Sequence, residues 1–587
     1  MPPEAGLTAA ALRRAAGLGP LLEARQAIED ATLPTDTPEA LAARAESLGR
    51  SDPGRAIDLY QEALKRAPHR LGWWLPIAKL ALELGSVDLA IDAAERVLRK
   101  HPGQSEAGTL LASALLRRRD FTRMAQVLRQ IRHPGAQAGN VANLTGTMLA
   151  QQARIGEALA AMRPIKSLAP RSAPLQMSRL MYLNYDPELS RAELFREHCS
   201  FGSAFTGTVA PVSQHLDRDR DPGRRLRIGY LSPDFRTHSV AYFMAPVLET
   251  FDRGQFDVVA YAHVARPDAV TGRLRSLASE WRDVTALDDA ELARLICDDR
   301  IDILVELAGF TKDSRLLACT GRPAPIQISY LGYPNTTGLP QVDYRITDHV
   351  ADPDDADDLH SETLVRLPRC FLAFAVPSHA PEIGPPPVLR TGHVTFGSFN
   401  NLAKVNHQVV ALWAEVLRAV AGSRLLLKAA GTGDPASQEH LRGAFGAAGV
   451  DPGRIDFAGY AATAPEHLAA YGEVDIALDT FPYNGTTTTC EALWMGVPVI
   501  TLAGDRHAGR VGASLLGAIG FRAGIATSPD EYVLTARLLA SQPELLAAAR
   551  RNLRPDMARS PLCDHAGHAR ALEEAYRAVW QIWCAQS

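Results

Sequence analysis

Four consecutive threonines at positions 486–489 are the residues of this chain whose type and spacing point most directly to chemistry. They follow the turn residues Asn484 and Gly485 and precede the helical pattern of residues 490–496, which ends on a glycine. One threonine is enough to cap a helix, and threonine is a middling helix former, so a run of four indicates a further role. Backbone N–H groups and the helix dipole at such a start attract anions. The run therefore predicts phosphate binding, and an ordinary helix cap with surplus threonines is the alternative.

The flanking residues place this polar loop at the edge of a sheet. Residues 474–478 and 497–502 are short apolar runs, which are typical of buried parallel strands. The loop of residues 484–488 then falls after the carboxyl end of one strand and before the amino end of a helix. Open α/β sheets bind their ligands at positions of this kind.

Three ionisable side chains follow similar strand and helix ends in the second half of the chain. Glu491 lies on the helix behind the threonines, where a carboxylate can bind ribose hydroxyls. Lys404 follows the segment FGSFNN, and His467 follows the strand pattern of residues 454–460. A lysine charge combined with helix N–H groups suits a diphosphate. The second half of the chain therefore predicts a nucleoside diphosphate site.

The middle of the chain offers a different set of groups. His238 comes directly after the strand pattern of residues 226–232, in DFRTHS. Its unperturbed pKa of about 6.5 suits general-base work, and the alternative is that it only orients the acceptor or a phosphate. The loop of residues 331–338, LGYPNTTG, contains Gly332 and Pro334 and suits an irregular wall of a binding site.

Several other ionisable residues have less specific surroundings. Asp299 and Asp302 flank a strand start and are possible acid–base groups, although a capping or solvated role is the simpler interpretation. His507 and Arg510 lie near another strand end, where Arg510 can face phosphates and His507 is either structural or part of the donor site. The pattern gives Lys312, in GFTKD, no defined role.

Several common motifs are missing from the sequence. No G-x-x-x-x-G-K-[ST] motif occurs, and no G-x-G-x-x-G follows residue 226 or residue 394, which argues against a P-loop ATPase and a dinucleotide oxidoreductase. The one acidic triplet with D-x-D spacing, at residues 217–219, lies in a charged linker. The seven cysteines form no C-x-x-C pair, so neither a zinc site nor a disulfide framework is indicated. Two Rossmann-like lobes with a diphosphate site of Thr, Glu and Lys fit a metal-independent nucleotide-sugar transferase.

The composition is that of an ordinary globular protein. The 587 residues are 46% hydrophobic and 22% charged, and the formal net charge is −4. This balance predicts neither nucleic acid nor a membrane as a partner. The N-terminus lacks the apolar core of a secretory signal, and no apolar run reaches the length of a membrane span. We therefore expect a cytoplasmic protein.

The first third of the chain carries a repeat. Prolines end similar helical segments at positions 68, 102, 134 and 170, with spacings of 34, 32 and 36 residues. Small residues keep the same register at Ala56, Ala90, Ala125 and Ala158. A period near 34 is the signature of tetratricopeptide repeats, which stack into a superhelix with a concave groove. The groove predicts protein or peptide partners, and Asn140 and Asn143 could bind an extended peptide; an irregular helical bundle is the alternative.

Strand and helix patterns alternate after residue 225, which predicts parallel sheets with helical crossovers. A proline-rich stretch interrupts the alternation and divides it into two lobes with a cleft between them. The predicted fold class is an α-helical solenoid followed by two Rossmann-like α/β domains. The predicted segments are helical repeats at 1–185 (irregular at 1–40), a helical transition and linker at 186–224, a first lobe at 225–374, a linker at 375–393, and a second lobe with terminal helices at 394–587.

Several long words occur in a fixed order over residues 226–516: GYLSPDFRTHS, LAGFTKDSR, RPAPIQISYLGYPNTTG, DYRITD, FGSFNNLAK and LDTFPYNGTTTTCEALWMGVPVITLAGD with RVGASLL. In these words, and in the order of repeats followed by two lobes, the chain resembles the nucleocytoplasmic protein O-GlcNAc transferases of glycosyltransferase family 41, in a bacterial form. The resemblance implies a GT-B fold, a UDP-GlcNAc donor, Ser or Thr of proteins as the acceptor, inversion at the anomeric carbon, and no metal or other cofactor.

The resemblance also implies roles for individual residues. Lys404 matches a lysine that contacts the diphosphate, and Thr487 and Thr488 match a threonine pair that holds the phosphates. Asn401 lies where animal members have Gln, lining the donor, and Thr486 lies where they have His, so its side-chain contact is the least secure.

Further roles follow from the other matching words. Glu491 replaces an Asp that binds the ribose, and His238 matches a histidine near the acceptor. The remaining donor-binding positions are Ala462 and His467 at the uracil, and Gly332 and Pro334 in the loop of residues 331–338.

Two other functions remain open at this stage. A relative in the same family with GDP-fucose or UDP-glucose as its donor would keep the phosphate site and differ in the base and sugar pockets. A non-catalytic scaffold would keep the repeats and bind nucleotide without chemistry. The large insert that animal relatives carry between the lobes is replaced here by the short linker at 375–393.

Overall fold

The computed structural model of the protein describes residues 37–49, 51–213, 215, 217–459, 461 and 463–586. The chain divides into two compact units, one ending at Leu110 and the other starting at Leu111. Each unit is described by itself. The predicted irregular segment 1–40 lies largely outside the described residues, and so does Ala462. In the described part, no helix is both long and apolar enough to cross a membrane.

The first unit consists of paired antiparallel helices. Thr37 and Asp52 cap two of them with their side-chain oxygens, and Gly85 ends another in the left-handed region at φ 74°. Ala56 and Ala90, which mark the repeat register, are completely buried, because small residues allow the helices to approach closely. The helices are α3 (Pro38–Leu48), α4 (Pro53–Arg66), η1 (Leu71–Trp73), α5 (Trp74–Leu84), α6 (Val87–Lys100) and α7 (Ser105–Arg118), which continues past Leu110.

Helices also form the first part of the second unit. They are α8 (Phe121–Gln130), η2 (Gly135–Gln137), α9 (Ala138–Gln151), α10 (Ile155–Met162), α11 (Ile165–Leu168), α12 (Ala173–Leu183) and α13 (Arg191–Phe205). Ser190 and Glu193 form a capping box at the start of α13. Phe201 and Phe205 of α13 share a buried core with the strands of the first lobe, so the helical array is anchored on that lobe.

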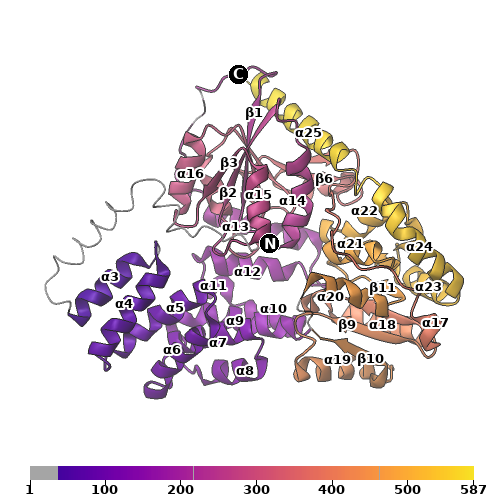
Figure 1. The fold of residues 1–587 in the computed structure, drawn as a ribbon, viewed down its shortest axis with the longest axis horizontal. Helices are drawn as coiled ribbons and strands as arrows, with labels where there is room; N and C mark the ends of the chain where they lie inside the picture. Colours follow the sequence, from indigo (N-terminus) through magenta and orange to yellow (C-terminus); the bar gives the residue numbers. More distant parts are fainter. Residues whose placement is uncertain are drawn as a thin grey trace, which may run out of the picture. The chain divides into compact units, whose positions relative to one another are not determined.

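The first lobe is a parallel sheet of seven strands in the order β3-β2-β1-β4-β5-β6-β7 (Figure 1). Its strands are β1 (Leu226–Ser232), β2 (Phe256–Ala262), β3 (Glu280–Asp283), β4 (Ile303–Glu306), β5 (Ile326–Ser329), β6 (Tyr344–Asp348) and β7 (Thr363–Leu367). Its helices are α14 (Ser239–Thr250), α15 (Ala269–Leu277), α16 (Asp289–Asp298), η3 (Leu316–Gly321) and η4 (Asp354–Leu359). The edge strands β3 and β7 lack a continuous apolar run, and the sequence analysis did not predict them.

The second lobe is a parallel sheet of six strands in the order β10-β9-β8-β11-β12-β13. Its strands are β8 (Thr395–Ser398), β9 (Arg424–Lys428), β10 (Ile455–Ala458), β11 (Ile476–Leu478), β12 (Val499–Leu502) and β13 (Ile525–Ala526). Its helices are η5 (Leu402–Lys404), α18 (His407–Ala419), α19 (Pro435–Ala447), η6 (Pro452–Arg454), α20 (Ala464–Ala469), η7 (Ala470–Glu473), α21 (Thr487–Trp494), η8 (His507–Gly509), α22 (Val511–Ala518) and η9 (Arg522–Gly524).

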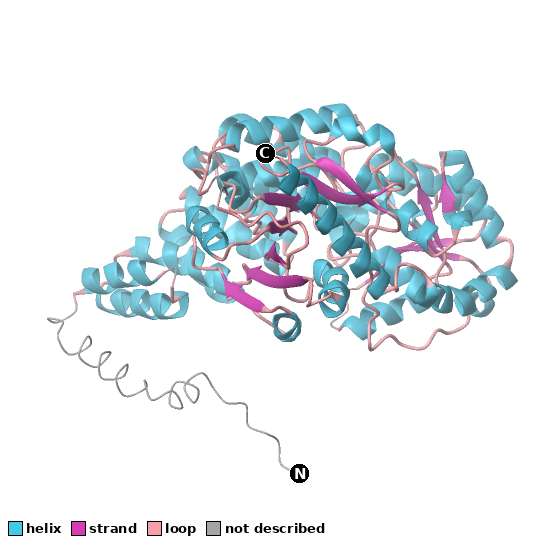
Figure 2. Cartoon of the chain, turned by 90° about the horizontal axis from the view of Figure 1, so that it is seen from above, coloured by secondary structure: helices cyan, strands magenta, loops and turns pink. Residues whose placement is uncertain are grey.

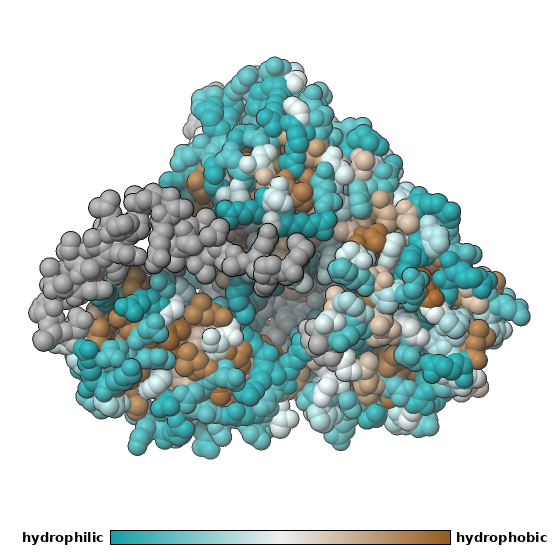
Figure 3. Space-filling model, in the orientation of Figure 1, coloured by the Kyte–Doolittle hydropathy of each residue, from teal (hydrophilic) through white to brown (hydrophobic). Residues whose placement is uncertain are grey.

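Helices cover the strands of both sheets, which explains why the central strands are buried on both faces (Figure 2). The outer surface of the two lobes is mainly hydrophilic on the face that Figure 3 shows. The proline-rich linker contains only the short helix α17 (Val388–Thr391).

The chain ends in three helices, α23 (Pro529–Ala540), α24 (Pro543–Arg559) and α25 (His565–Ala585). The sequence-based division placed residues 394–587 in one lobe, but α25 returns to the first lobe and packs against α14 (Figure 1). The hydroxyls of Tyr576 on α25 and Tyr230 on β1 lie 3.1 Å apart inside this contact. The last helix therefore packs on the first lobe although it follows the second lobe in the sequence.

The strand order fixes where a ligand can bind. In each sheet the first strand has a neighbour on either side, so the order reverses between β1 and β4 and between β8 and β11. The crevice outside the carboxyl ends of strands at such a reversal is the usual ligand position in open α/β sheets. These strand ends carry the residues described next.

Candidate active site

A buried carboxylate organises the loop at the end of β11. Asp479 accepts hydrogen bonds from the backbone N–H of Gly485 at 2.7 Å, from that of Thr480 at 2.9 Å, and from the hydroxyl of Thr501 at 2.8 Å. Burial raises the pKa of Asp479 to about 6. Because three donors converge on one carboxylate, the loop of residues 480–485 is held in a single shape. Asp479 was not among the predicted residues, although a carboxylate directly after a buried strand is a typical position for a functional side chain.

Gly485 lets the chain pass close to the helix that follows. A Cβ at this position would lie 2.5 Å from the hydroxyl oxygen of Thr488 and 2.8 Å from that of Thr489, so only glycine fits. Asn484 fixes the other side of the turn, since its side chain donates to the carbonyl of Thr480 and accepts from the N–H of Gly512. The backbone of residues 484–485 therefore lies directly against the start of α21.

The threonine run forms the amino end of α21. Thr486 occupies the cap position, yet its side chain makes no capping hydrogen bond within the described structure. The simple-cap interpretation therefore does not describe Thr486. Thr486, Thr487 and Thr488 are half-buried, whereas Thr489 is buried beneath them. Three threonines consequently line an accessible helix start, where backbone N–H groups and the dipole favour an anion.

Lys404 brings a positive charge to this loop. Its ammonium group donates to the carbonyl of Asn484 at 2.6 Å and to the side-chain oxygen of Asn400 at 3.3 Å, and it lies 4.3 Å from the centre of the Tyr483 ring. Burial lowers the pKa of Lys404 to about 8, against the opposing effect of Asp479. Lys404 is therefore still mainly protonated at neutral pH, and it lies against the loop that precedes the threonines.

Asn400 joins the two halves of this arrangement. Its side-chain oxygen accepts from Lys404 and also from the Thr488 hydroxyl at 3.2 Å. The predicted residue was its neighbour Asn401, which is exposed and caps η5 through the N–H of Ala403. The sequence FNN gave no basis for choosing between the two asparagines, because strand geometry decides which side chain turns inward.

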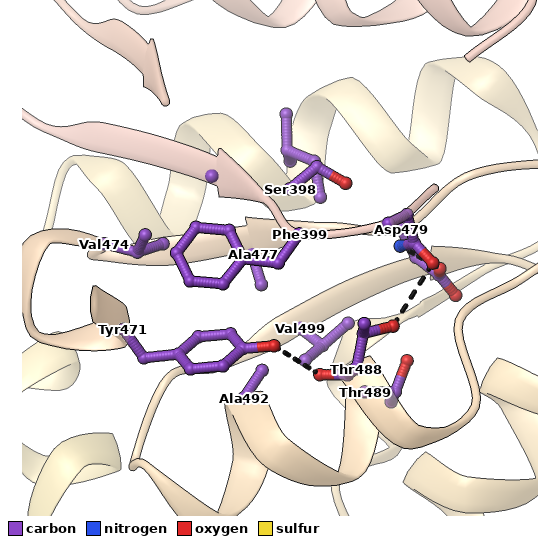
Figure 4. A pocket seen from close by; sticks show the side chains of 13 residues that line it. Ser398, Phe399, Tyr471, Val474, Ala477, Asp479, Thr488, Thr489, Ala492 and Val499 are labelled. Carbon is purple, nitrogen blue, oxygen red and sulfur yellow. Dashed lines mark hydrogen bonds between the residues drawn. The ribbon is translucent and has the colours of Figure 1, made fainter. Parts of the chain in front are cut away.

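A small pocket of about 20 Å³ opens beside Thr488 (Figure 4). The rings of Phe399 and Tyr471 lie at one end, and Asp479 and Thr488 lie at the other. The Tyr471 hydroxyl donates to the backbone carbonyl of Thr488 at 3.1 Å. The space holds about one water molecule, so it is too small for a sugar. The side chains that line it pack against the start of α21.

Glu491 and His467 meet at the far side of α21. The His467 Nε2 lies 3.0 Å from the Glu491 carboxylate, and the Lys428 ammonium lies 2.5 Å from Nδ1. Because lysine can only donate, Nδ1 accepts and the Nε2 proton points to Glu491. The structure thus joins two of the predicted donor residues and adds Lys428, which the sequence analysis missed. Ala462, predicted beside them, lies outside the described residues.

His238 lies at the carboxyl end of β1, where it caps α14. Its Nδ1 accepts from the backbone N–H of Val240 at 3.3 Å and lies 3.5 Å from a carboxylate oxygen of Asp234. Burial, with a smaller contribution from Arg236, lowers the pKa of His238 to about 4. Asp234 was not predicted, although it lies four residues before His238 in the word GYLSPDFRTHS.

The loop of residues 331–338 is a rigid wall in the first lobe. Gly332 packs so closely that a Cβ would lie 1.9 Å from the carbonyl of Leu307, and Pro334 is buried. The buried Arg345 donates to the carbonyls of Tyr333 and Asn335 and fixes the loop between them. Gly332 and Pro334 therefore contribute to the fixed shape of this loop.

The charge of Glu491 on α21 of the second lobe affects Tyr242 on α14 of the first lobe. Burial and then the charge of Glu491 raise the pKa of Tyr242 on α14. The helix that His238 caps is therefore within electrostatic reach of the helix that the threonines begin.

Several predicted alternatives are structural. Asp302, directly before β4, forms a bidentate ion pair with Arg224, and Asp299, after α16, pairs with Arg282 on β3. His507 donates through Nδ1 to Asp352 at 2.6 Å across the two lobes. Two others lie outside the cluster: Arg510 donates to the carbonyls of Val350 and Gly504, and Lys312 is 76% exposed. Among the described residues, no group of three or more His, Cys, Asp or Glu is placed to hold a metal ion.

Comparison with known proteins gives the family. The model of glycosyl transferase family 41 matches residues 208–380 and 388–572, and a tetratricopeptide repeat model matches residues 47–114. The Arabidopsis thaliana protein named "Probable UDP-N-acetylglucosamine--peptide N-acetylglucosaminyltransferase SPINDLY" is 43% identical over 71% of this chain and 46% of its own length. The SEC protein of the same plant, with the same enzyme name, is 34% identical over 68% of this chain and 41% of its own length.

A solved structure covers more of the molecule. A mutant of the Thermobaculum terrenum O-GlcNAc transferase superimposes with a TM-score of 0.83 at 34% identity, over 88% of this chain and 99% of that one. The plant relatives are longer, and this chain spans somewhat less than half of their length. The family model covers both lobes, including β1, β8 and the threonine-rich start of α21. The chain belongs to glycosyl transferase family 41, with tetratricopeptide repeats preceding its two α/β lobes.

Proposed function

We propose that this protein is an inverting glycosyltransferase that moves GlcNAc from UDP-GlcNAc to Ser or Thr hydroxyls of proteins. The observation that carries the proposal is the joining of Lys404 and Thr488 through Asn400 at the start of α21. This arrangement suits a diphosphate leaving group, and family membership and the names of the relatives agree with it.

The chemistry follows from where charge develops. As the bond between the sugar and the diphosphate breaks, the leaving oxygen becomes more negative. Lys404 and the amino end of α21 are already fixed next to the loop that would hold it, so they stabilise this charge without reorganising. The acceptor hydroxyl attacks the opposite face of the sugar, and we propose His238 on the first lobe as the group that takes its proton.

We extend the proposal to the residues that would hold the rest of the donor. Glu491, oriented by His467, would bind the ribose, and Lys428 adds a hydrogen-bond donor beside them that suits a carbonyl of the base. Thr486, Thr487 and Asn401 would contribute to the same surface.

The proposal also covers the need for a metal, the place of the acceptor and the cellular location. Lys404 and the helix start supply the positive charge that a metal ion supplies elsewhere, so we propose a reaction without a metal or other cofactor. The repeats would hold protein or peptide acceptors along their groove. All seven cysteines are free thiols, and because the cytoplasm keeps thiols reduced, we propose a cytoplasmic location.

The contact from Lys428 does not distinguish UDP-GlcNAc from GDP-fucose, because guanine presents a carbonyl as uracil does. Purified protein incubated with an acceptor lysate and labelled UDP-GlcNAc, UDP-glucose or GDP-fucose separates the possibilities. We expect transfer from UDP-GlcNAc, equal with and without a chelator. Turnover with GDP-fucose alone would move the function to fucosyl transfer. Absence of transfer and hydrolysis with all three would leave a nucleotide-binding scaffold.

A further inference from the structure

Asp234 and His238 form a pair in the loop between β1 and α14. A carboxylate oxygen of Asp234 lies 3.5 Å from Nδ1 of His238. The Asp234 side chain is 6% exposed, whereas that of His238 is 35% exposed. A buried carboxylate therefore lies behind a partly exposed imidazole.

The loop holds this pair at a fixed distance. The N–H of Asp234 donates to the Ser232 hydroxyl at 2.9 Å, and the N–H of Arg236 donates to the Asp234 carbonyl at 2.8 Å. The N–H of Thr237 donates to Asp268, the cap of α15, at 2.8 Å. Bonds at both ends of the turn and one bond within it therefore restrain the separation of the two side chains.

Two groups compete for the same nitrogen of His238. The N–H of Val240 points at Nδ1, and that contact requires a lone pair there, with the proton on Nε2. An ionised Asp234 favours the opposite tautomer, with the proton on Nδ1 and the lone pair on Nε2. In the first tautomer His238 can only donate toward the cleft, and in the second it can accept a proton.

We propose that Asp234 is a positioning residue that, when ionised, keeps the His238 proton on Nδ1 and so makes Nε2 the base for the acceptor hydroxyl. The proposal rests on the proposed transferase function. The acceptor oxygen forms its bond to the anomeric carbon while the bond from that carbon to the diphosphate breaks. The hydroxyl proton moves to Nε2, and the bonding pair leaves on the diphosphate oxygen. Asp234 then faces an imidazolium that it stabilises by charge.

The charges around Asp234 set the pH at which this pair works. Burial raises the pKa of Asp234 to about 6; Arg236 opposes the rise and Asp313 adds to it. Glu306 on β4, with a pKa raised by burial to about 7, is a further negative neighbour when ionised. Asp234 is therefore mainly ionised at pH 7 and becomes neutral as the pH falls below about 6, and base catalysis should fall with it.

The first test determines the tautomer of His238 by chemical modification and does not require enzymatic turnover. Diethylpyrocarbonate reacts with an imidazole nitrogen that has a free lone pair, and peptide mass spectrometry measures the rate at His238. In Asp234→Asn, the amide and Val240 both favour the tautomer with the proton on Nε2. We expect the reaction at His238 to slow about ten-fold at pH 7 in this variant, as a change of tautomer requires.

The matched control is Asp313→Asn. This change removes a neighbouring negative charge without touching His238, and Asn tolerates the positive φ of 62° at this position. Its His238 should react as in the unchanged protein at pH 7. Equal slowing in both variants, or no slowing in Asp234→Asn, would overturn the proposal. Asp234→Glu retains the carboxylate, so its His238 should react with diethylpyrocarbonate faster than that of Asp234→Asn. This comparison shows whether the slowing comes from the lost charge or from a disturbed fold.

The second test uses kinetics with whichever donor turns over. In Asp234→Asn we expect kcat to fall by about 10²-fold, the usual contribution of a general base, with the donor KM unchanged. The acid limb near pH 6 should disappear. An unchanged kcat and pH profile would contradict the proposal. If the unchanged protein shows no transfer, the proposed function fails, and the diethylpyrocarbonate rates still decide the role of Asp234.

Discussion

At the scale of single residues, Lys404 is distinguished by a charge that lacks a counter-ion. Asp479, the nearest carboxylate in its surroundings, is occupied by N–H and hydroxyl donors, and Lys404 makes no ion pair in the described part of the chain. Holding a partly buried ammonium beside carbonyl and amide oxygens costs free energy. A diphosphate next to it would repay that cost, because the charge that is unfavourable in the empty site becomes favourable in the filled one.

Lys404→Met should therefore separate activity from stability. We expect kcat to fall by about 10²–10³-fold, the usual effect of removing one preorganised charge donor. UDP should also raise Tm less than in the unchanged protein, since the stabilisation by a ligand at a given concentration increases with its affinity. The Tm of the ligand-free variant should be equal or higher, because the uncompensated charge is gone.

Lys312→Met is the matched control, since Lys312 is 76% exposed on a loop of the first lobe. It should leave both the rate and the UDP-induced shift unchanged. Comparable activity in Lys404→Met and the unchanged protein would show that charge stabilisation does not come from Lys404.

At the scale of elements, the contact between α13 and the loop of residues 331–338 positions the first lobe against the helical array. Gly202 on α13 meets Gly338 so closely that a Cβ would lie 1.7 Å from the Gly338 carbonyl. His198 lies one turn earlier on the same face of α13, and its Nε2 is 2.6 Å from the Tyr333 hydroxyl. A close backbone approach and a buried hydrogen bond therefore hold this loop against α13.

Gly202→Ala should disturb this contact severely. The added methyl overlaps backbone that cannot move as a flexible side chain does, and overpacking of this kind costs about 1–3 kcal/mol. Gly156→Ala is the control, because α10 leaves open space there and alanine favours a helix. Calorimetry should show a lower Tm for the first variant and an equal or higher Tm for the second. Equal Tm values would mean that α13 does not pack as described.

His198 should make the same contact sensitive to acid. Burial lowers its pKa to about 4 in the folded protein, below about 6.5 in the unfolded chain. Its share of stability is fully present above pH 6.5 and is lost as the pH falls toward 4, because only the unfolded chain takes up the proton. From about pH 7.5 to about pH 5 this amounts to about 2 kcal/mol.

His198→Gln should reduce the drop in Tm between these two pH values, whatever its effect at pH 7.5. His349→Gln, which alters a histidine that is 67% exposed, should leave the drop unchanged. An equal drop in all three proteins would indicate that His198 titrates normally.

At the scale of the whole molecule, the sequence predicted the architecture better than the details. Period-34 spacing and the alternation of buried strands with helices identified the repeats and two parallel sheets. The edge strands β3 and β7 escaped because their residues are only partly buried and lack the apolar run that marks central strands. The return of α25 to the first lobe was also invisible, since a long-range contact such as that between Tyr576 and Tyr230 leaves no local pattern.

The candidate site shows the same division. Lys404 and Thr488 stood out because their types are unusual at strand and helix ends, and the structure brings them together. Asn400 and Asp479 did not stand out, because their importance lies in which way a side chain points. The link between His238 and Asp234 required a turn geometry that sequence spacing alone does not fix.

The most direct measurement of the central claim is a crystal structure of this protein with UDP, grown without added metal. The account predicts the β-phosphate at the amino end of α21, within hydrogen-bond distance of the Lys404 ammonium and the Thr487 and Thr488 backbone, with Glu491 at the ribose. A diphosphate bound elsewhere in the cleft, with Lys404 still donating only to Asn484 and Asn400, would contradict the account.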